Sequence, residues 1–415
     1  MHTFFLSCLD CIVLTAVVVL VPATVHSATW DIDIEVLRLL KQSIDPNTIP
    51  RSSFLSSWNF AADPCESAGG QFQGILCTNP LDGSNSRITE IYLDSIGYDG
   101  FLTPSIGNLT ELTTLDLSRN SFRGPIPDSI SNLRKLTTLS LPGNFFTGII
   151  PVGLIRLKKL QKMDLSYNNL SGSIPANISG LRSLTHLILS HNGFSGRIPD
   201  FTGAWQLHTL DLGWNQLYGN LPKFPISLRT LSLGHNLLSG HISRVGNLMK
   251  LKSLDLSYNR FTGTISHGIL SLPKVVRIDV SVNRFTAIEV IKISGETELQ
   301  EFNAQINLLR GHLPINFVTY RNLTSINLAR NQFSGRIPAE YGAKLGNSWR
   351  NLFLDHNLLT GDLPPQFNSA TRRIRGSLSK NCLSCPRIIP FCRGGQRPDS
   401  ECVGQTDGGE LQIKH

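Results

Sequence analysis

Five aspartates are the residues of this chain whose type and recurrence could support catalysis. They occupy the same place in short apolar motifs of the LDLS type: Asp116, Asp164, Asp211, Asp255 and Asp279. Paired carboxylates can act as general acid and base, but we interpret these recurring aspartates as polar positions of a repeated sheet. The chain has no G-x-S-x-G, H-E-x-x-H or phosphate-loop motif. The sequence therefore predicts neither an enzyme nor a cofactor.

Cysteines are the second group with chemistry of their own. Cys382 and Cys385 form a C-x-x-C motif, which can bind zinc or act in redox exchange. In a secreted chain, however, clustered cysteines normally form disulfides. We expect Cys65 to pair with Cys77, leave the pairing of the last four cysteines open, and predict no metal site. The six cysteines are Cys65, Cys77, Cys382, Cys385, Cys392 and Cys402.

Both ends of the chain bear on its location. Residues 11–21 form an uncharged apolar run, too short to span a bilayer, which needs about 20 apolar residues. Small residues follow it, so we predict a signal peptide over residues 1–27 and a secreted, extracellular protein. The tail, residues 403–415, has no hydrophobic span or lipid-anchor signal, so we expect no membrane anchor in this chain.

The charge balance indicates anionic partners. The chain has 38 Lys and Arg against 30 Asp and Glu, a net charge of +8. In an extracellular setting such a surface favours acidic polysaccharides or acidic proteins, and nucleic acid is not expected. A modest excess of positive charge also serves solubility alone, and both interpretations stay open.

Asparagine marks an internal repeat. Eleven asparagines recur at spacings of 21 to 26 residues, and apolar residues stand eight, five and three positions before each one. This alternation predicts short strands with one buried face, which parallel stacking of the repeats joins into one core. Phe or Leu follows each asparagine by two positions and should be buried as well. The asparagines are Asn120, Asn144, Asn168, Asn192, Asn215, Asn236, Asn259, Asn283, Asn307, Asn331 and Asn357.

Many repeats carry a second signature, such as GSIP at Gly172 and GRIP at Gly196. Together the two signatures resemble the plant-specific leucine-rich-repeat class, found in receptor kinases, receptor-like proteins and polygalacturonase-inhibiting proteins. The resemblance covers residues from about 30 to 402. It implies an α/β leucine-rich-repeat solenoid, a curved right-handed superhelix with a parallel sheet on the concave face and disulfide-stapled caps. The extracellular location would then be the apoplast or the cell surface.

The resemblance also divides the chain into parts. The front cap departs from the family's W-x-G-V-x-C pattern, because the sequence is FQGILC with Phe72 in place of tryptophan. We expect a signal peptide at 1–27, an amino-terminal cap at 28–87, about eleven to twelve repeats at 88–371, a carboxy-terminal cysteine cap at 372–402 and a tail at 403–415.

The residue just before each asparagine should point outward on the concave face. In five successive repeats this residue is aromatic or imidazole, which predicts a stripe of rings that could anchor a ligand. Two further apolar residues are expected to be exposed on the same face. An alternative is that these residues only follow the family consensus. The candidate ligand-binding residues are Tyr167, Ile188, His191, Trp214, His235, Tyr258 and Phe353.

Four N-x-[ST] sequons mark faces that a partner could not cover if they carry glycans. The acceptor residues are Asn108, Asn169, Asn177 and Asn322.

We expect a recognition protein that binds a peptide or a partner ectodomain through its concave face. The resemblance to receptor-like proteins implies that a separate membrane receptor kinase supplies signalling. The alternative is a secreted inhibitor or wall-associated protein that binds a pectin-degrading enzyme or pectin, an acidic cell-wall polysaccharide. Against this alternative, such inhibitors usually have four cysteines in the front cap, and this chain has two.

Overall fold

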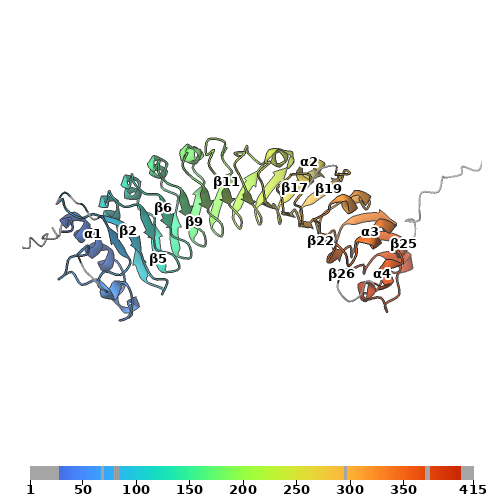
Figure 1. The fold of residues 1–415 in the computed structure, drawn as a ribbon, viewed down its shortest axis with the longest axis horizontal. Coiled ribbons are helices and arrows are strands. Elements are labelled where there is room, and N and C mark those ends of the chain that lie inside the picture. The colour runs from blue at the N-terminus through green and yellow to red at the C-terminus, as the bar shows by residue number, and fades with distance from the viewer. Residues whose placement is uncertain are drawn as a thin grey trace, which may run out of the picture.

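The computed structural model describes residues 28–66, 70–78, 80, 82, 84–293, 297–369 and 374–402 of the 415-residue chain. The predicted signal peptide and the predicted tail lie outside the described residues. The described chain forms a long arc (Figure 1). In this part of the chain, no helix combines the length and the apolar character needed to cross a membrane.

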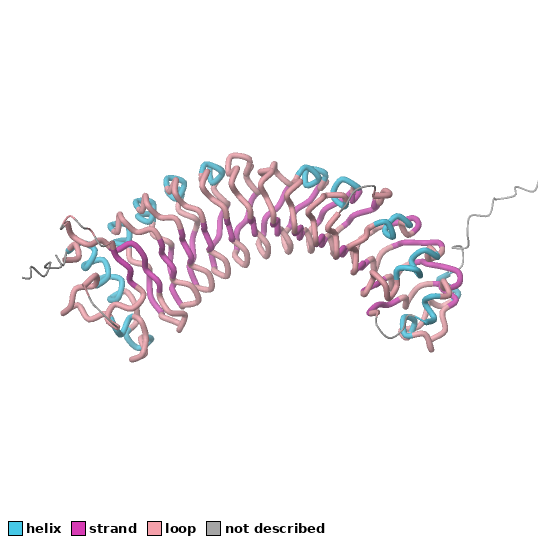
Figure 2. The backbone as a smooth tube through the Cα atoms, viewed as in Figure 1, coloured by secondary structure: helices cyan, strands magenta, loops and turns pink. Residues whose placement is uncertain are grey.

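One sheet of fourteen short strands follows the inner side of the arc, and the helices lie mainly on the outer side (Figure 2). The first strand is antiparallel to the second, and every later pair is parallel. Its strands, in spatial order, are β1 (Ile75–Cys77), β2 (Ile88–Tyr92), β4 (Thr114–Asp116), β6 (Thr138–Ser140), β8 (Lys162–Asp164), β10 (His186–Ile188), β12 (Thr209–Asp211), β14 (Thr230–Ser232), β16 (Ser253–Asp255), β18 (Arg277–Asp279), β20 (Glu301–Asn303), β22 (Ser325–Asn327), β24 (Asn351–Phe353) and β26 (Arg375–Ser377).

The second half of the repeats forms two smaller parallel sheets. Gly172 takes a φ of 77°, and a Cβ there would meet the Ile149 side chain at 2.7 Å, which explains the recurrent glycine. One sheet has β3 (Asp99–Phe101), β5 (Ser121–Pro125), β7 (Phe145–Gly148), β9 (Asn169–Ser173), β11 (Gly193–Arg197), β13 (Gln216–Gly219), β15 (Leu237–Gly240), β17 (Arg260–Ile265) and β19 (Arg284–Ile288). The other has β21 (Arg310–His312), β23 (Gln332–Gly335), β25 (Leu358–Asp362) and β27 (Cys382–Ser384).

The interruption between these two sheets falls where the glycine is lost. Ala287 stands in the place of the glycine, and it is not among the residues with positive φ. The register of β19 against β17 shifts between Gly263 and Thr264, and the next sheet begins only at β21. The loss of the signature therefore has a local structural consequence.

Short helices complete the repeats and the caps. The α-helices are α1 (Asp31–Gln42), α2 (His267–Leu270), α3 (Ala339–Lys344), α4 (Gln366–Ser369) and α5 (Asp399–Cys402). The 3-10 helices are Pro46–Thr48, Leu55–Ser57, Pro104–Asn108, Asp128–Asn132, Val152–Arg156, Ala176–Gly180, Ser243–Asn247, Ile315–Thr319 and Pro390–Cys392.

The asparagines form a hydrogen-bonded ladder between the sheets. The amide Nδ2 of Asn168 donates to the carbonyls of Leu141, Leu165 and Ser166 at 2.9 to 3.1 Å, and its Oδ1 accepts the N–H of Phe146 at 3.0 Å. The side chain therefore satisfies backbone groups at the turn that have no strand partner. The Phe or Leu two residues after each predicted asparagine is fully buried, which confirms that expectation.

A partly buried ion pair joins the amino-terminal cap to the start of β2. Asp33 is fully buried and accepts hydrogen bonds from the Arg87 guanidinium at 2.9 and 3.0 Å and from the Ile88 N–H at 2.9 Å. Phe72 is 2% exposed and stacks on Trp58 at 6.3 Å, so the smaller ring still fills the core at the family's tryptophan position.

Three disulfides fasten the caps. Cys65 bonds to Cys77 as predicted, and the open pairing resolves as Cys382 to Cys402 and Cys385 to Cys392. The two cysteines of the C-x-x-C motif therefore have different partners. Among the described residues, no group of three or more His, Cys, Asp or Glu side chains could hold a metal ion.

Asn381 continues the ladder as a twelfth rung that the sequence analysis missed. Its Nδ2 donates to the Leu354 and Leu378 carbonyls at 3.0 Å, and its Oδ1 accepts the Leu359 N–H. The spacing of 24 from Asn357 and the apolar Leu378 were available signals. Gly376 hid the pattern, because it stands where the other repeats have an apolar residue.

Phe391 of the carboxy-terminal cap fills the space left at Gly376. A Cβ there would meet Phe391 at 2.7 Å and the Leu352 carbonyl oxygen at 2.1 Å. The phenylalanine ring is 3% exposed and packs edge-on against Phe367 at 5.9 Å. The last repeat is thus completed by a side chain from the cap.

Candidate binding surface

Five rings form one continuous stack on the concave side. We call Tyr167, His191, Trp214, His235 and Tyr258 the ring line. Successive ring centroids are 4.0, 5.1, 3.5 and 4.0 Å apart, with planes inclined by only 11° to 14°. The structure thus brings together five of the seven residues that the sequence analysis selected for ligand binding.

The backbone of each ring-line residue is in the left-handed conformation. Tyr167 has a φ of 54° and Trp214 a φ of 55°, a region in which L-residues are uncommon and cost about 1 to 2 kcal/mol. Two bonds to neighbouring repeats fix Tyr167: its N–H donates to the Ser190 carbonyl at 2.9 Å, and its carbonyl accepts the Asn144 N–H at 3.1 Å. The stack is therefore anchored by the same turn that creates the asparagine ladder.

Stacking determines which part of each ring a ligand can meet. Because neighbouring rings cover the faces of His191, Trp214 and His235, only ring edges point to solvent there. Tyr167, Trp214 and Tyr258 remain 59%, 51% and 47% exposed. The interior of the line consequently offers edges with hydrogen-bonding groups rather than flat faces on which a sugar could lie.

The two imidazoles are held toward the neutral form. Burial lowers the pKa of His191, and the nearby Asp211 carboxylate opposes that effect only in part. Burial also lowers the pKa of His235, against the opposing charges of Asp255 and Asp279, while the His191 charge adds to the lowering. Each neutral ring keeps one N–H donor and one acceptor nitrogen.

The remaining two predicted ligand residues lie elsewhere on the sheet. Ile188 is half-buried at the end of β10, in register with Asp164 and Asp211. Phe353, also half-buried, is on β24, four strands beyond β16 in sheet order. It lines a shallow hollow of about 280 Å³ whose rim includes Arg277 and Arg375. The structure does not join Phe353 to the ring line.

The recurrent aspartates accept hydrogen bonds from the turns that follow their strands. Asp164 Oδ1 accepts the N–H of Ser166 at 3.1 Å and its hydroxyl at 2.7 Å, and Asp255 makes the same pair of bonds to Ser257. This side chain therefore caps the turn between the strand and the ring position. The five carboxylates lie on five different strands, β4, β8, β12, β16 and β18, and those of Asp164 and Asp255 are engaged by their turns.

Basic side chains gather where the concave strands begin. Along five successive repeats this edge carries Lys, Arg and His side chains and no carboxylate, and among the described residues none of its members forms an ion pair. Burial lowers the pKa of His208, and the positive charges of Arg229, His186 and Lys250 lower it further. We call this set the basic edge: Lys158, Lys159, Lys162, Arg182, His186, His208, Arg229, Lys250 and Lys252.

The acceptor asparagines of the four sequons are all exposed. Asn169 is the first residue of β9, and the ladder residue Asn168 separates it from Tyr167 along the chain. The Asn322 amide donates to the Thr297 carbonyl at 2.7 Å, so this side chain already has a partner.

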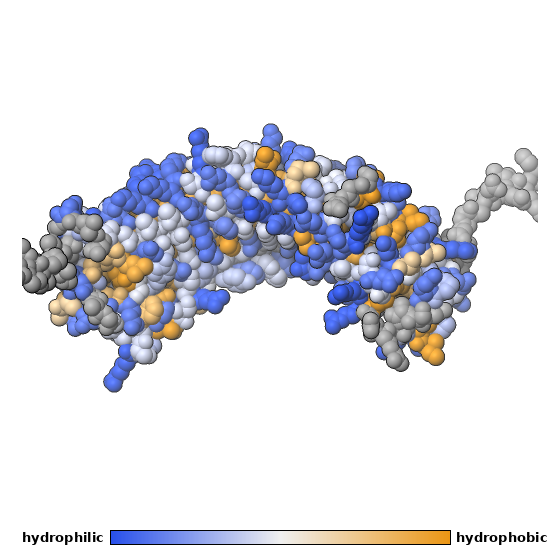
Figure 3. All heavy atoms as spheres, in the orientation of Figure 1, coloured by the Kyte–Doolittle hydropathy of each residue, from blue (hydrophilic) through white to orange (hydrophobic). Residues whose placement is uncertain are grey.

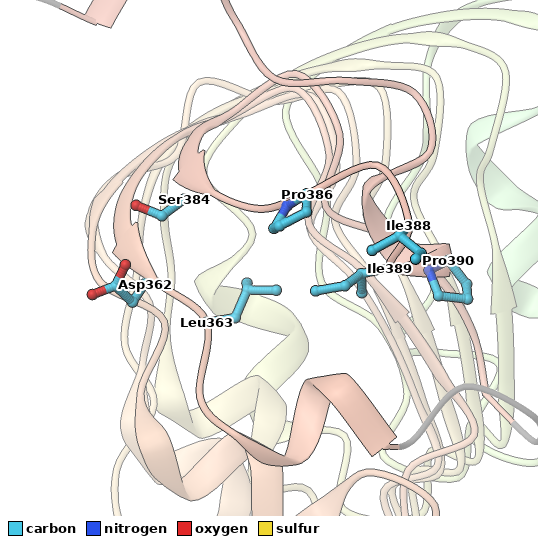
Figure 4. Close-up of a pocket in the computed structure, with 7 residues that line it drawn as sticks. All are labelled: Asp362, Leu363, Ser384, Pro386, Ile388, Ile389 and Pro390. Atoms are coloured by element: carbon cyan, nitrogen blue, oxygen red, sulfur yellow. The ribbon is translucent and has the colours of Figure 1, made fainter.

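A second hollow, of about 640 Å³, lies in the carboxy-terminal cap (Figure 4). Leu363, Pro386 and Ile389 line it, and Ile388 beside them is 87% exposed. This hollow is far from the ring line along the solenoid.

On the face shown in Figure 3, hydrophilic residues cover much of the arc and larger hydrophobic clusters lie toward its ends.

Family models match several parts of the chain. The model described as leucine rich repeat N-terminal domain matches residues 31–78, and models described as leucine rich repeat match 134–194 and also 111–133, 250–272 and 322–343. The N-terminal match falls inside the predicted amino-terminal cap. A search of curated proteins found no match.

Solved structures that match the chain include plant receptors. The complex PEPR1-AtPEP1 matches with a TM-score of 0.61 and 27% identity over 85% of this chain and 56% of that one. A TDR receptor matches at 0.54 and 30%, over 71% and 60%. The ectodomain of the Arabidopsis receptor kinase HAESA, bound to an extended IDA peptide hormone, matches at 0.56 and 28%, over 69% and 53%. The chain thus spans between half and two thirds of the length of these three matched chains.

Proposed function

Because the chain is a leucine-rich-repeat protein similar to plant receptor ectodomains, we propose that it is an extracellular recognition protein. It binds a peptide or a partner ectodomain through the concave face, and a separate membrane kinase supplies the signal. The observation that carries this proposal is the ring line. Five rings are held rigidly by stacking and by fixed backbone, and three of them stay about half exposed. Binding then loses little side-chain entropy.

The comparisons support a ligand of this class. One similar structure is a receptor kinase ectodomain in complex with a peptide hormone, and its identity of 28% makes the likeness more than one of fold. The absence of catalytic motifs agrees with a binding role.

The test is a binding screen against secreted peptides and receptor-kinase ectodomains by surface plasmon resonance. A variant with Tyr167→Ala, Trp214→Ala and Tyr258→Ala should lose binding to whichever partner the native protein retains. Trp205→Ala is the matched control, because Trp205 is 61% exposed but lies outside the ring line. If a partner binds the triple variant as tightly as the native protein, the ring-line residues only follow the family consensus and do not bind that partner.

The basic edge favours a second candidate function, retention on acidic cell-wall polysaccharide. Its cations form no ion pair among the described residues and follow one another along the solenoid, which suits a linear polyanion. Immobilised polygalacturonate should retain the native protein at low salt and release it as salt rises. Lys158→Gln, Lys159→Gln and Lys162→Gln together should weaken retention, whereas the ring-line variant should not. Equal retention of the lysine variant would remove this candidate.

A further inference from the structure

Three large apolar residues are exposed at the same position of successive repeats. Trp205, Ile226 and Met249 stand four residues before the first residue of β12, β14 and β16, respectively. The parallel register of these strands places the three positions in one row, at steps of about 5 Å. The residues are 61%, 72% and 56% exposed. We call them the apolar row, and a contiguous exposed group of this kind indicates a contact surface.

The same position carries positive charge in the three preceding repeats. Arg134, Lys158 and Arg182 stand four residues before β6, β8 and β10, in register with the apolar row. The core does not require an apolar residue at this position, since Leu228, two residues after Ile226, is already fully buried. The change from charged to apolar side chains therefore has a reason other than core packing.

The repeats that carry the apolar row also have shorter outer turns. From Asn192 to Asn259, the spacings between successive ladder asparagines are 23, 21 and 23 residues, against 24 for the three spacings on either side. In the described chain, no helix lies between the 3-10 helices Ala176–Gly180 and Ser243–Asn247, and Figure 2 shows loops there on the outer side of the arc. Less of the outer turn stands beside these side chains, so a broad surface can reach them.

Positive charge surrounds the apolar row. Residues 182–252 contain seven Lys or Arg and two Asp, so this segment supplies a net charge of +5 out of the chain's +8. Arg182, Arg229 and Lys250 are exposed and form no ion pair among the described residues. The Lys252 N–H donates to the Arg229 carbonyl at 2.7 Å, so the segments that carry these cations are adjacent. The surface thus combines apolar contact with attraction for anions.

A lipid surface fits this combination better than a soluble polyanion. More than half of each apolar-row residue is exposed to solvent, so the row can insert between lipid headgroups. Trp is enriched at membrane interfaces, and Lys and Arg side chains bind anionic headgroups. An acidic polysaccharide would use the cations alone. Residues 182–252 contain no N-x-[ST] sequon, so no predicted glycan lies in this segment.

We propose that the apolar row and the cations around it dock this edge of the solenoid on an anionic lipid surface. Trp205, Ile226 and Met249 insert at the level of the headgroups, and the neighbouring cations contact lipid phosphates. The apolar row precedes the concave strands and the ring line follows them, so a docked protein keeps the ring line open. The proposal thus goes beyond the proposed function and does not depend on it.

Co-sedimentation of the full chain with lipid vesicles tests the proposal. We expect binding to phosphatidylcholine vesicles that contain about one quarter phosphatidylglycerol, weaker binding as salt rises, and none to phosphatidylcholine alone. Trp205→Ser, Ile226→Ser and Met249→Ser together should weaken binding at least about tenfold. The same variant should keep its retention on polygalacturonate and its binding at the ring line, which separates this surface from both proposed functions.

A second exposed apolar group provides the matched control. Phe145, Ile149 and Val152 are 55%, 57% and 65% exposed, and they lie on β7 and just after it. Changing these three residues to Ser should leave vesicle binding unaltered. An unchanged circular dichroism spectrum confirms that each variant is folded. A loss of binding as large as that of the apolar-row variant would overturn the proposal.

The charge contribution is tested with Arg182→Gln, Arg229→Gln and Lys250→Gln. Each removed cation should weaken binding to the anionic vesicles by about fivefold at low salt. No binding of the native protein to these vesicles would overturn the proposal, as would full binding by the apolar-row variant. Polyglutamate is the comparison ligand. If it binds and the vesicles do not, the surface recognises an acidic polypeptide and the lipid proposal is wrong.

Discussion

Asn168→Ala should destabilise the protein through a single orphaned backbone donor. The Leu165 carbonyl keeps a hydrogen bond from Asn192 at 2.9 Å, and the Leu141 carbonyl keeps one from Asn144 at 3.2 Å. The N–H of Phe146, a fully buried residue, donates to Asn168 Oδ1 at 3.0 Å and has no other side-chain partner among the described residues. A buried unsatisfied donor costs about 1 to 3 kcal/mol.

Three donations from the Asn168 amide are lost as well. We therefore expect a total loss of about 2 to 4 kcal/mol in the free energy of unfolding. Asn168→Asp should cost at least as much, because its carboxylate still accepts the Phe146 N–H but sets a buried negative charge, in place of the donating amide, against three carbonyl oxygens. The difference between these two variants separates the acceptor role of the side chain from its donor role.

Urea denaturation followed by circular dichroism measures these changes. Asn169→Ala is the matched control in unglycosylated protein, since Asn169 is the adjacent residue of the same type and is exposed. A surface change of this kind should stay within about 0.5 kcal/mol. A loss below about 0.5 kcal/mol for Asn168→Ala would refute the assignment of a specific role to this rung. A more stable Asn168→Asp would refute the donor argument.

Two further predictions concern the ring line and the last repeat. Because the pKa values of His191 and His235 are lowered on folding, the unfolded chain binds more protons just below pH 6.5, so their contribution to stability should be lost as the pH falls through that value. In denaturant titrations from about pH 7.5 to 5, a variant with both histidines changed to Gln should lose less stability than the native protein, and an equal or larger loss would contradict this. Gly376→Ala should destabilise the carboxy-terminal end, because its Cβ would meet the Leu352 carbonyl oxygen at 2.1 Å. Faster proteolysis of that end is the expected result, and unchanged proteolysis would mean that the backbone can shift without cost.

Much of the solenoid could be predicted because residues close together in sequence determine the structure of each repeat. The positions of Leu112, Leu115 and Leu117 before Asn120 give strand, core and turn within nine residues, and neighbouring repeats bury the same face. The Cys65 to Cys77 bridge was predictable for a similar reason, because no other cysteine lies nearby. The order of the ring residues likewise follows from the repeat spacing alone.

Contacts between distant segments could not be derived in the same way. The pairing of the last four cysteines depends on how the final loop folds back, and the composition of that loop allows three answers. Gly376 concealed the last repeat because the ring that completes its core, Phe391, comes from a later segment. No local pattern relates these two positions.

The sequence alone determined that Tyr167, His191, Trp214, His235 and Tyr258 would succeed one another at one per repeat. Only the tertiary structure decided that they stack face to face and leave ring edges open to solvent. The physical reason is the curvature and spacing of the stacked repeats together with the left-handed turn, which set ring separations of 3.5 to 5.1 Å. Spacing along a chain fixes which residues are neighbours, and packing fixes which surfaces they leave free.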